Sequence, residues 1–153
     1  MDLSGIVQQA IRDRTADVER HQLRVKAAVR PAWVIGDPTL IARLVANLCD
    51  NAVHYNTLGG VIDISTRLDT GRAVLVIANT GPVVPPDEVH RLFEPFQRLH
   101  RVSDDAHHGL GLSIVRAIVA AYSAELNAYA RPGGGLAVEI AFPAAEANPR
   151  PAG

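Results

Sequence analysis

Two short connections, each predicted to join adjacent antiparallel strands, constrain the fold of this chain most strongly. Residues 69–71 (DTG) and residues 131–135 (RPGGG) each separate two runs in which apolar side chains alternate with other residues. Short connections rich in Gly and Asp favour β-hairpins, because glycine adopts the positive φ angles that tight turns need. The chain therefore contains two antiparallel strand pairs, which the remaining segments must cover.

Helices are expected where apolar residues recur every three or four positions, and strands where they alternate. The expected helices are residues 3–19, 38–55, 87–92 and 110–122. The expected strands are residues 21–29, 33–35, 61–68, 73–78, 125–130 and 136–142. Amphipathic helices need one face of a sheet to cover, so the predicted fold class is α+β. We expect a two-layer α/β sandwich, with a mixed, mostly antiparallel sheet of about five strands covered on one face by about three helices.

Length and charge narrow the class of protein. The chain has 153 residues, of which 48% are hydrophobic and 20% charged, as in one soluble globular domain. A formal net charge of −1 argues against a nucleic-acid-binding protein. The single cysteine, Cys49, excludes a disulfide framework, and we expect it to serve in core packing. No apolar run approaches the length of a membrane span and the start does not resemble a signal peptide, so we expect a cytoplasmic chain without membrane contact.

Polar side chains form a stripe on the helix expected at residues 38–55, beside its apolar face. The stripe contains Asn47, Asn51, His54 and Tyr55, at spacings that place them on one side of the helix. One asparagine could simply cap neighbouring backbone or hold a water molecule. Two asparagines together with a histidine and a tyrosine favour a ligand site, and an amide oxygen is a ligand suited to Mg²⁺.

Two glycine-containing segments follow. Residues 107–115 (HHGLGLSIV) run into a helix, where free backbone amides and the helix dipole favour a phosphate group, although such glycines also serve as caps or packing points. Residues 79–85 (NTGPVVP) leave a strand directly, as either a plain turn or part of a site. Residues 92–96 (LFEPF) favour a small hydrophobic packing cluster.

In this order, the segments resemble the ATP-binding catalytic domain of bacterial sensor histidine kinases, a group related to gyrase B, mismatch-repair ATPases and the large heat-shock chaperone. The matching boxes are the asparagine box at residues 47–55 (NLCDNAVHY), the first glycine box at 79–82, the phenylalanine box at 92–96 and the second glycine box at 109–115. The resemblance covers residues 2–143 and implies the Bergerat ATP-binding fold. We therefore expect one domain over residues 1–143 and a flexible tail over residues 144–153.

The resemblance implies ATP and Mg²⁺ as cofactors and a role for each matching residue. Asn51 would ligate Mg²⁺ and Asn47 would polarise the phosphate region, which makes these two the expected catalytic residues. Tyr55 would pack against the adenine, Asn79 would bind its amino group, and Gly81 would give the base room. The other residues expected to bind the nucleotide are His54, Val84, Arg98, Gly109, Leu110, Gly111, Leu112 and Ser113. Residues 97–108 would form a mobile lid.

The chain departs from the family pattern in places. The family usually has aspartate where this chain has Asn79, and glycine at the positions of Val83 and His107. Asparagine can still accept a hydrogen bond through its amide oxygen. His21 lacks the acidic neighbour of a phosphoacceptor, so we expect the acceptor histidine on a dimerisation segment, either in a longer chain or in a separate protein, with a response regulator downstream.

The primary hypothesis is a protein-histidine kinase module that donates the γ-phosphate of ATP to that acceptor. One alternative is a serine kinase of the anti-sigma-factor type. Another is a degenerate nucleotide-binding or interaction module, motivated by the replacements at Asn79 and His107. The phenylalanine box and the lid favour the first hypothesis.

Overall fold

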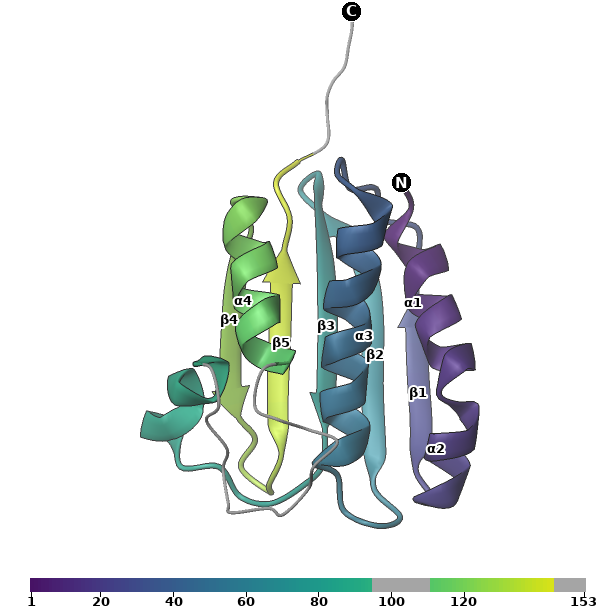
Figure 1. The fold of residues 1–153 in the computed structure, drawn as a ribbon, viewed down its shortest axis with the longest axis vertical. Coiled ribbons are helices and arrows are strands. Elements are labelled where there is room, and N and C mark those ends of the chain that lie inside the picture. Colours follow the sequence, from purple (N-terminus) through teal and green to yellow (C-terminus); the bar gives the residue numbers. More distant parts are fainter. Residues whose placement is uncertain (95–110, 145–153) are drawn as a thin grey trace, which may run out of the picture.

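Five strands form one mixed sheet, and helices cover one of its faces (Figure 1). The computed structural model describes residues 1–94 and 111–144. The strands are β1 (Arg24–Val29), β2 (Val61–Asp69), β3 (Arg72–Asn79), β4 (Glu125–Ala130) and β5 (Leu136–Ala141). The helices are α1 (Leu3–Asp13), α2 (Thr15–Arg20), α3 (Pro38–His54) and α4 (Gly111–Ala121), with a 3-10 helix η1 (Pro86–Phe93).

The order of strands across the sheet is β1-β2-β3-β5-β4. The pair β1 and β2 is parallel, and the other three pairs are antiparallel. Both predicted hairpins are present, and in the first of them Thr70 and Gly71 both have positive φ angles, as a two-residue hairpin turn requires. The predicted fold class, a mixed and mostly antiparallel sheet with helices on one face, is confirmed.

Helix α3 lies in the middle of the helical layer, between α1 and α4 (Figure 1). It begins where the sequence predicts, because the carboxylate of Asp37 accepts a hydrogen bond from the Thr39 amide at 2.9 Å and Pro38 occupies the first turn. Its apolar face is buried against the sheet by Ile41, Leu44, Val45, Leu48, Ala52 and Val53. Burying a side chain of this size contributes about 1.5–3 kcal/mol, so α3 is the main contact between the two layers.

A single helix over residues 3–19 was a wrong prediction, because the helical geometry is interrupted at Arg14. The backbone there has φ −110° and ψ 14°, and its amide donates to the carbonyl of Ile11. The Thr15 hydroxyl donates to the carbonyl of Arg12 at 2.9 Å, a local bond of the kind that competes with regular helix geometry. The chain therefore continues as a second, shorter helix, α2.

A strand over residues 33–35 was also predicted wrongly. Trp33 makes only an isolated antiparallel bridge with Asp2. The amide of Val34 donates to the carbonyl of Met1 at 2.9 Å, and the amide of Leu3 donates to the carbonyl of Ala32 at 2.7 Å. Because the chain turns into α1 at Leu3, the segment has no partner long enough to extend the pairing.

The shorter predicted elements agree more closely. The helix expected at residues 87–92 is the 3-10 helix η1, and the helix expected at residues 110–122 is α4. The predicted lid at residues 97–108 lies outside the described residues, as does most of the predicted tail. In the part of the chain that the structure describes, no helix combines the length and apolar character needed to cross a bilayer.

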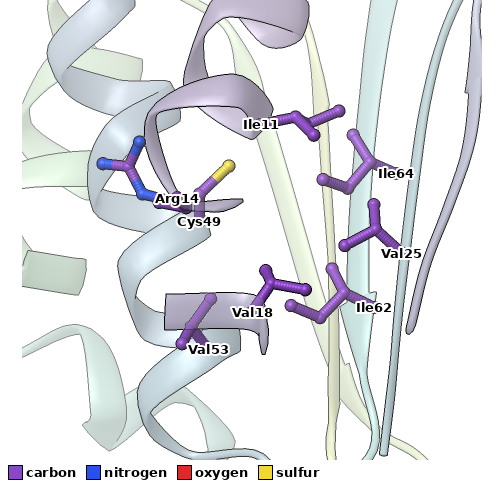
Figure 2. A pocket seen from close by; sticks show the side chains of 8 residues that line it. All are labelled: Ile11, Arg14, Val18, Val25, Cys49, Val53, Ile62 and Ile64. Carbon is purple, nitrogen blue, oxygen red and sulfur yellow. The ribbon is translucent and has the colours of Figure 1, made fainter. Parts of the chain in front are cut away.

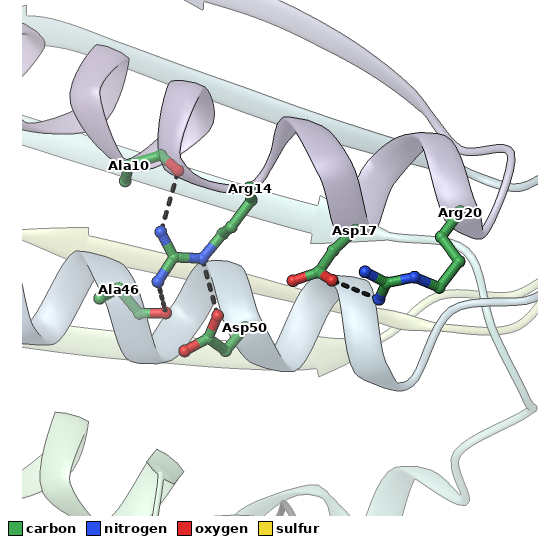
Figure 3. A network of polar contacts seen from close by, with 6 residues as sticks. All are labelled: Ala10, Arg14, Asp17, Arg20, Ala46 and Asp50. Carbon is green, nitrogen blue, oxygen red and sulfur yellow. Dashed lines mark hydrogen bonds and ion pairs between the residues drawn. The ribbon is translucent and has the colours of Figure 1, made fainter.

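Arg14, at the end of α1, donates three hydrogen bonds, two of which connect it to α3 (Figure 3). Its guanidinium donates to the carboxylate of Asp50 at 2.7 Å, and to the carbonyls of Ala10 at 2.9 Å and Ala46 at 3.3 Å. Burial by itself lowers the pKa of Arg14, but the hydrogen bond and the charge of Asp50 outweigh burial and raise it. This partly buried ion pair therefore holds the N-terminal helix against α3 with a permanently charged donor.

A small cavity lies between the N-terminal helices, α3 and the sheet (Figure 2). Its volume is about 10 Å³, which is on the order of the space of one water molecule, and its walls are almost wholly apolar. The residues that line it are Ile11, Arg14, Val18, Val25, Cys49, Val53, Ile62 and Ile64. Burial raises the pKa of the Cys49 thiol to about 11, so this cysteine stays protonated at neutral pH and serves in packing, as predicted.

Asp2 is the N-terminal cap of α1, and its contribution to the stability of the fold can be tested. Its carboxylate accepts from the amides of Ser4 and Ala32, both at 3.0 Å, and the bond from Ala32 is the main cause that lowers its pKa below the ordinary 3.8. Asp2→Ala is expected to lower the free energy of unfolding by about 1 kcal/mol, measured by urea denaturation at pH 7. Asp2→Asn, which keeps an acceptor oxygen, is the control and is expected to cost less.

The lowered pKa of Asp2 also predicts that the stability of the fold depends on pH. A carboxyl whose folded pKa is lowered stabilises the fold above its unfolded pKa, and this contribution is lost as pH falls through the folded pKa. The stability difference between the wild type and Asp2→Ala is therefore expected to narrow as the pH falls below 3.8. A difference that stays constant from pH 7 down to the acid limit of folding would contradict this account.

Candidate functional site

The predicted site residues converge where α3 and β3 end, at the lower end of the sheet in Figure 1. Tyr55 is the C-terminal cap of α3, and Asn79 is the last residue of β3. The two segments meet at Gly81, where a Cβ atom would collide with the carbonyl oxygen of Tyr55. Gly81 is therefore required by the close approach of two backbones, a reason that the sequence did not supply.

The polar stripe of α3 leads into this junction. Asn51 is buried, with 9% of its surface exposed, and Asn47 lies one turn earlier on the same helix and is half-buried. The Nδ2 atom of Asn47 is buried and has no hydrogen-bond partner among residues 1–94 and 111–144. A buried amide group without a partner is unfavourable by roughly 1–3 kcal/mol, so a bound acceptor at this atom would stabilise the structure.

His54 and Tyr55 complete the stripe at the end of α3. Their rings pack edge to face, with centroids 4.7 Å apart and an interplanar angle of 88°. Both residues are half-buried. The two perpendicular rings form an aromatic pair at the end of the helix that carries the two asparagines.

Asn79 is buried at the same junction, with 5% of its surface exposed. Its Nδ2 atom donates to the carbonyl of Thr80 at 2.7 Å. This contact uses one N–H group of the amide, and Oδ1 is the acceptor atom of the same side chain. This orientation suits a ligand with an amino group.

The glycines of the second hairpin pack directly on the segment that follows β3. Gly134 and Gly135 have φ angles of 109° and 99°, and a Cβ atom at either position would collide with a carbonyl oxygen, that of Gly81 or Asn79 respectively. The amide of Gly135 donates to the carbonyl of Pro82 at 2.8 Å. This hairpin therefore supports the residues around Asn79 from the β5 side.

Helix α4 runs antiparallel to α3. The backbone amide of Asp37, at the start of α3, donates to the hydroxyl of Tyr122, just past the end of α4, at 2.8 Å. The first turn of α4, with Gly111 and Ser113, therefore lies toward the C-terminal end of α3, and both residues are half-buried.

The remaining predicted site residues divide into two groups. Leu112 and Val84 are almost fully buried in the hydrophobic core, so their side chains contribute packing. Arg98, Gly109 and Leu110 lie outside the described residues.

Two residues of this junction were missed by the sequence reasoning. Asn56 and Thr80 directly follow the predicted site residues Tyr55 and Asn79, and the Thr80 hydroxyl donates to the Asn56 Oδ1 atom at 2.5 Å. The only sequence signal was that Asn and Thr side chains often bond to backbone in turns. Their contact joins segments 24 residues apart, which local patterns do not predict.

A metal site made of side-chain carboxylates, thiolates or imidazoles is absent from residues 1–94 and 111–144, since no group of three or more His, Cys, Asp or Glu residues is placed to hold an ion. The amide oxygens of the asparagine pair are hard ligands on α3. A divalent ion at this site would therefore take most of its ligands from water and from phosphate oxygens, which is the usual coordination of Mg²⁺.

Comparison with known proteins identifies the relatives of this chain. A family model described as histidine kinase-, DNA gyrase B-, and HSP90-like ATPase matches residues 36–146. Sensor protein CutS of Streptomyces coelicolor is 42% identical over 146 residues, covering 94% of this chain and 35% of CutS. Sensor-like histidine kinase SenX3 of Mycobacterium tuberculosis is 29% identical over 147 residues, covering 94% of this chain and 36% of SenX3. The chain thus spans about a third of the length of these relatives.

Solved structures agree with this comparison. The mycobacterial sensor histidine kinase MprB superposes with a TM-score of 0.81 at 30% identity, covering 94% of this chain and 96% of that chain. The catalytic domain of histidine kinase ThkA superposes with a TM-score of 0.79 at 20% identity, covering 94% of this chain and 93% of the other, which supports the fold alone.

The junction at Gly81 predicts a large difference between two glycine substitutions. Gly81→Ala is expected to lower the free energy of unfolding by about 1–3 kcal/mol, because the added methyl group collides with the Tyr55 carbonyl. Gly133→Ala is the matched control, since a Cβ atom there meets nothing within 4 Å, and it is expected to change stability by at most about 0.5 kcal/mol. Urea denaturation of both variants checks this, and equal losses would disprove the close approach.

Proposed function

Since this chain belongs to the family of histidine kinase-, DNA gyrase B-, and HSP90-like ATPases, we propose that it is the Mg-ATP-binding catalytic module of a two-component sensor histidine kinase. In this role it donates the γ-phosphate of ATP to a histidine on a dimerisation segment. That segment belongs either to the same full-length chain or to a separate protein, and a response regulator receives the phosphate afterwards. The proposed location is the cytoplasm, where ATP and the response regulator are found.

The observation that carries this proposal is the asparagine pair on the buried side of α3. Asn51 is buried, and one turn earlier the Nδ2 atom of Asn47 is buried without a partner in the described part of the chain. A nucleotide phosphate oxygen is an acceptor that satisfies such a donor. The Asn51 amide oxygen is of the hard type that holds Mg²⁺ together with phosphates. When bound, Mg²⁺ would neutralise charge on the phosphate oxygens.

The other end of the site is proposed to bind the base. The ring of Tyr55 packs against the adenine, and the Oδ1 atom of Asn79 accepts from the adenine amino group. This assignment is supported by the contact of the Asn79 Nδ2 atom with the Thr80 carbonyl, which leaves Oδ1 as the acceptor. Gly81 keeps a side chain out of this narrow place, because its backbone lies against the Tyr55 carbonyl.

Between the two ends, the first turn of α4 is proposed to bind the phosphates. Backbone amides at a helix N-terminus have no partner within the helix, and the helix dipole favours negative charge there. Gly111, Leu112 and Ser113 are the described residues of this turn, and Gly109 and Leu110 extend the proposed set. His54 and Arg98 are the proposed cationic or hydrogen-bonding side chains near the phosphates.

Catalysis in this proposal depends on position rather than on a strong base. The imidazole of the acceptor histidine is itself a nucleophile, so the module has to hold the γ-phosphate in line with it and stabilise the charge of the transferred group. The contribution of this chain is a fixed nucleotide, with Asn47 directed at the phosphates and the base end held by Tyr55 and Asn79.

The assignment of Asn51 is tested by a metal-dependent measurement. Asn51→Ala is expected to raise the Kd for ATP in the presence of Mg²⁺ by about tenfold or more, because a ligand oxygen is lost, and to leave the Kd in EDTA nearly unchanged. Isothermal titration calorimetry measures both constants. Asn127→Ala, at an exposed position of β4, is the control. An Asn51→Ala variant with the full Mg²⁺ dependence of the wild type would refute the metal assignment.

The reaction class is tested by the stability of the phosphorylated product. The chain is incubated with γ-labelled ATP and a dimerisation segment of a related sensor kinase that contains its histidine. We expect label on that segment which is lost in acid and kept in alkali, because phosphohistidine is acid-labile. Label that survives acid would favour the serine-kinase alternative, and absence of Mg-ATP binding in calorimetry would favour the degenerate interaction module.

A further inference from the structure

A small polar cluster next to the proposed base-binding end has no role in the reaction described above. The Thr80 hydroxyl donates to the Asn56 Oδ1 atom at 2.5 Å and accepts from the amide of Val61 at 2.9 Å. The Nδ2 atom of Asn56 donates to the carbonyls of Ala52 at 3.2 Å and Val61 at 3.1 Å. The cluster therefore ties together the end of α3, the start of β2 and the end of β3.

The cluster leaves no room for a side chain at position 60. A Cβ atom at Gly60 would collide with both the Asn56 Oδ1 atom and the Thr80 hydroxyl. The amide of Thr80 also donates to the carbonyl of Val61 at 3.1 Å, so the backbone of Thr80 is fixed together with its side chain. The position of the Thr80 carbonyl is thus determined by the cluster.

The Thr80 carbonyl in turn sets the orientation of the Asn79 side chain. The Asn79 Nδ2 atom donates to this carbonyl at 2.7 Å, so the amide presents its oxygen to a ligand. An asparagine amide without such a contact can rotate by 180° and present its N–H groups instead. This matters for the choice of base, because adenine carries an amino donor where guanine carries a carbonyl acceptor.

We propose that Thr80 and Asn56 are positioning residues that make the site select adenine over guanine, by fixing the Asn79 amide with its oxygen toward the base. The proposal rests on the proposed function, namely that Asn79 contacts the base of a nucleotide. An aspartate at position 79 would present acceptor oxygens in either orientation. The asparagine of this chain needs a fixed orientation, and the Asn56–Thr80 contact supplies it.

The test compares two threonines whose hydroxyl groups both donate and accept hydrogen bonds, one beside Asn79 and one distant from it. Thr80→Val removes the hydroxyl beside Asn79. Thr66→Val is the matched control, because Thr66 is a buried strand threonine whose hydroxyl donates to the Arg30 carbonyl at 2.6 Å and accepts from the Arg30 amide at 2.9 Å, in the part of β2 that pairs with Leu75 rather than Asn79. Kd values for Mg-ATP and Mg-GTP are measured by calorimetry, and folding is checked by thermal denaturation.

Thr80→Val is expected to reduce the preference for ATP over GTP by about tenfold, through weaker ATP binding, stronger GTP binding or both. Thr66→Val is expected to lose stability but to keep the wild-type ratio of the two Kd values, and Thr80→Ser, which keeps the hydroxyl, is expected to retain the preference. Should Thr80→Val not fold, Thr80→Ala and Thr66→Ala replace the pair.

Two results overturn the inference while leaving the proposed function intact. One is an unchanged ATP preference in both Thr80→Val and Thr80→Ala, and the other is an equal loss of preference in the Thr66 control. A wild-type chain that binds neither nucleotide overturns the proposed function itself, and the inference with it. The wild-type titration therefore separates the two failures.

Discussion

The structure depends on the burial of the apolar face of α3 against the middle of a sheet that helices cover on one face. The other helices on this face pack beside it, α1 through the Arg14–Asp50 ion pair and α4 through the bond between Tyr122 and Asp37. The polar stripe lies on the C-terminal half of α3, toward the end of the layer where β3 also finishes. Asn51 is buried there but is not part of the hydrophobic core.

At the site end of the molecule, backbone atoms of different chain segments are in close contact. Gly81 lies against the Tyr55 carbonyl, and Gly134 and Gly135 lie against the carbonyls of Gly81 and Asn79. Three chain segments thus meet with hardly a side chain between them, which keeps Asn79 close to the end of α3. Close backbone contact of this kind resists rearrangement, because the neighbouring atoms belong to the sheet and to a helix end and have no alternative rotamers.

Several parts of the site could be read from the sequence because their signals are local. The stripe from Asn47 to Tyr55 follows from helical spacing, and the start of α3 follows from Asp37 and Pro38. The hairpin turns follow from glycines at positions of positive φ. Two other predictions were wrong, because the structure at those places depends on residues that are distant in the sequence. The pairing of Trp33 stops after one bridge since its partner at Asp2 turns into a helix, and the break at Arg14 accompanies contacts to residues of α3.

The sequence by itself determined the family, most of the order of the elements and the identity of the polar residues on α3, because periodicity and short motifs are properties of neighbouring residues. The tertiary structure decided why the glycines are needed and how Asn79 is oriented. The Asn56–Thr80 contact joins residues 24 positions apart, and the contact of Gly134 with Gly81 joins segments that η1, α4 and β4 separate along the chain. Such contacts arise only when the chain is folded, since they depend on the distance between atoms in space and not on their spacing along the sequence.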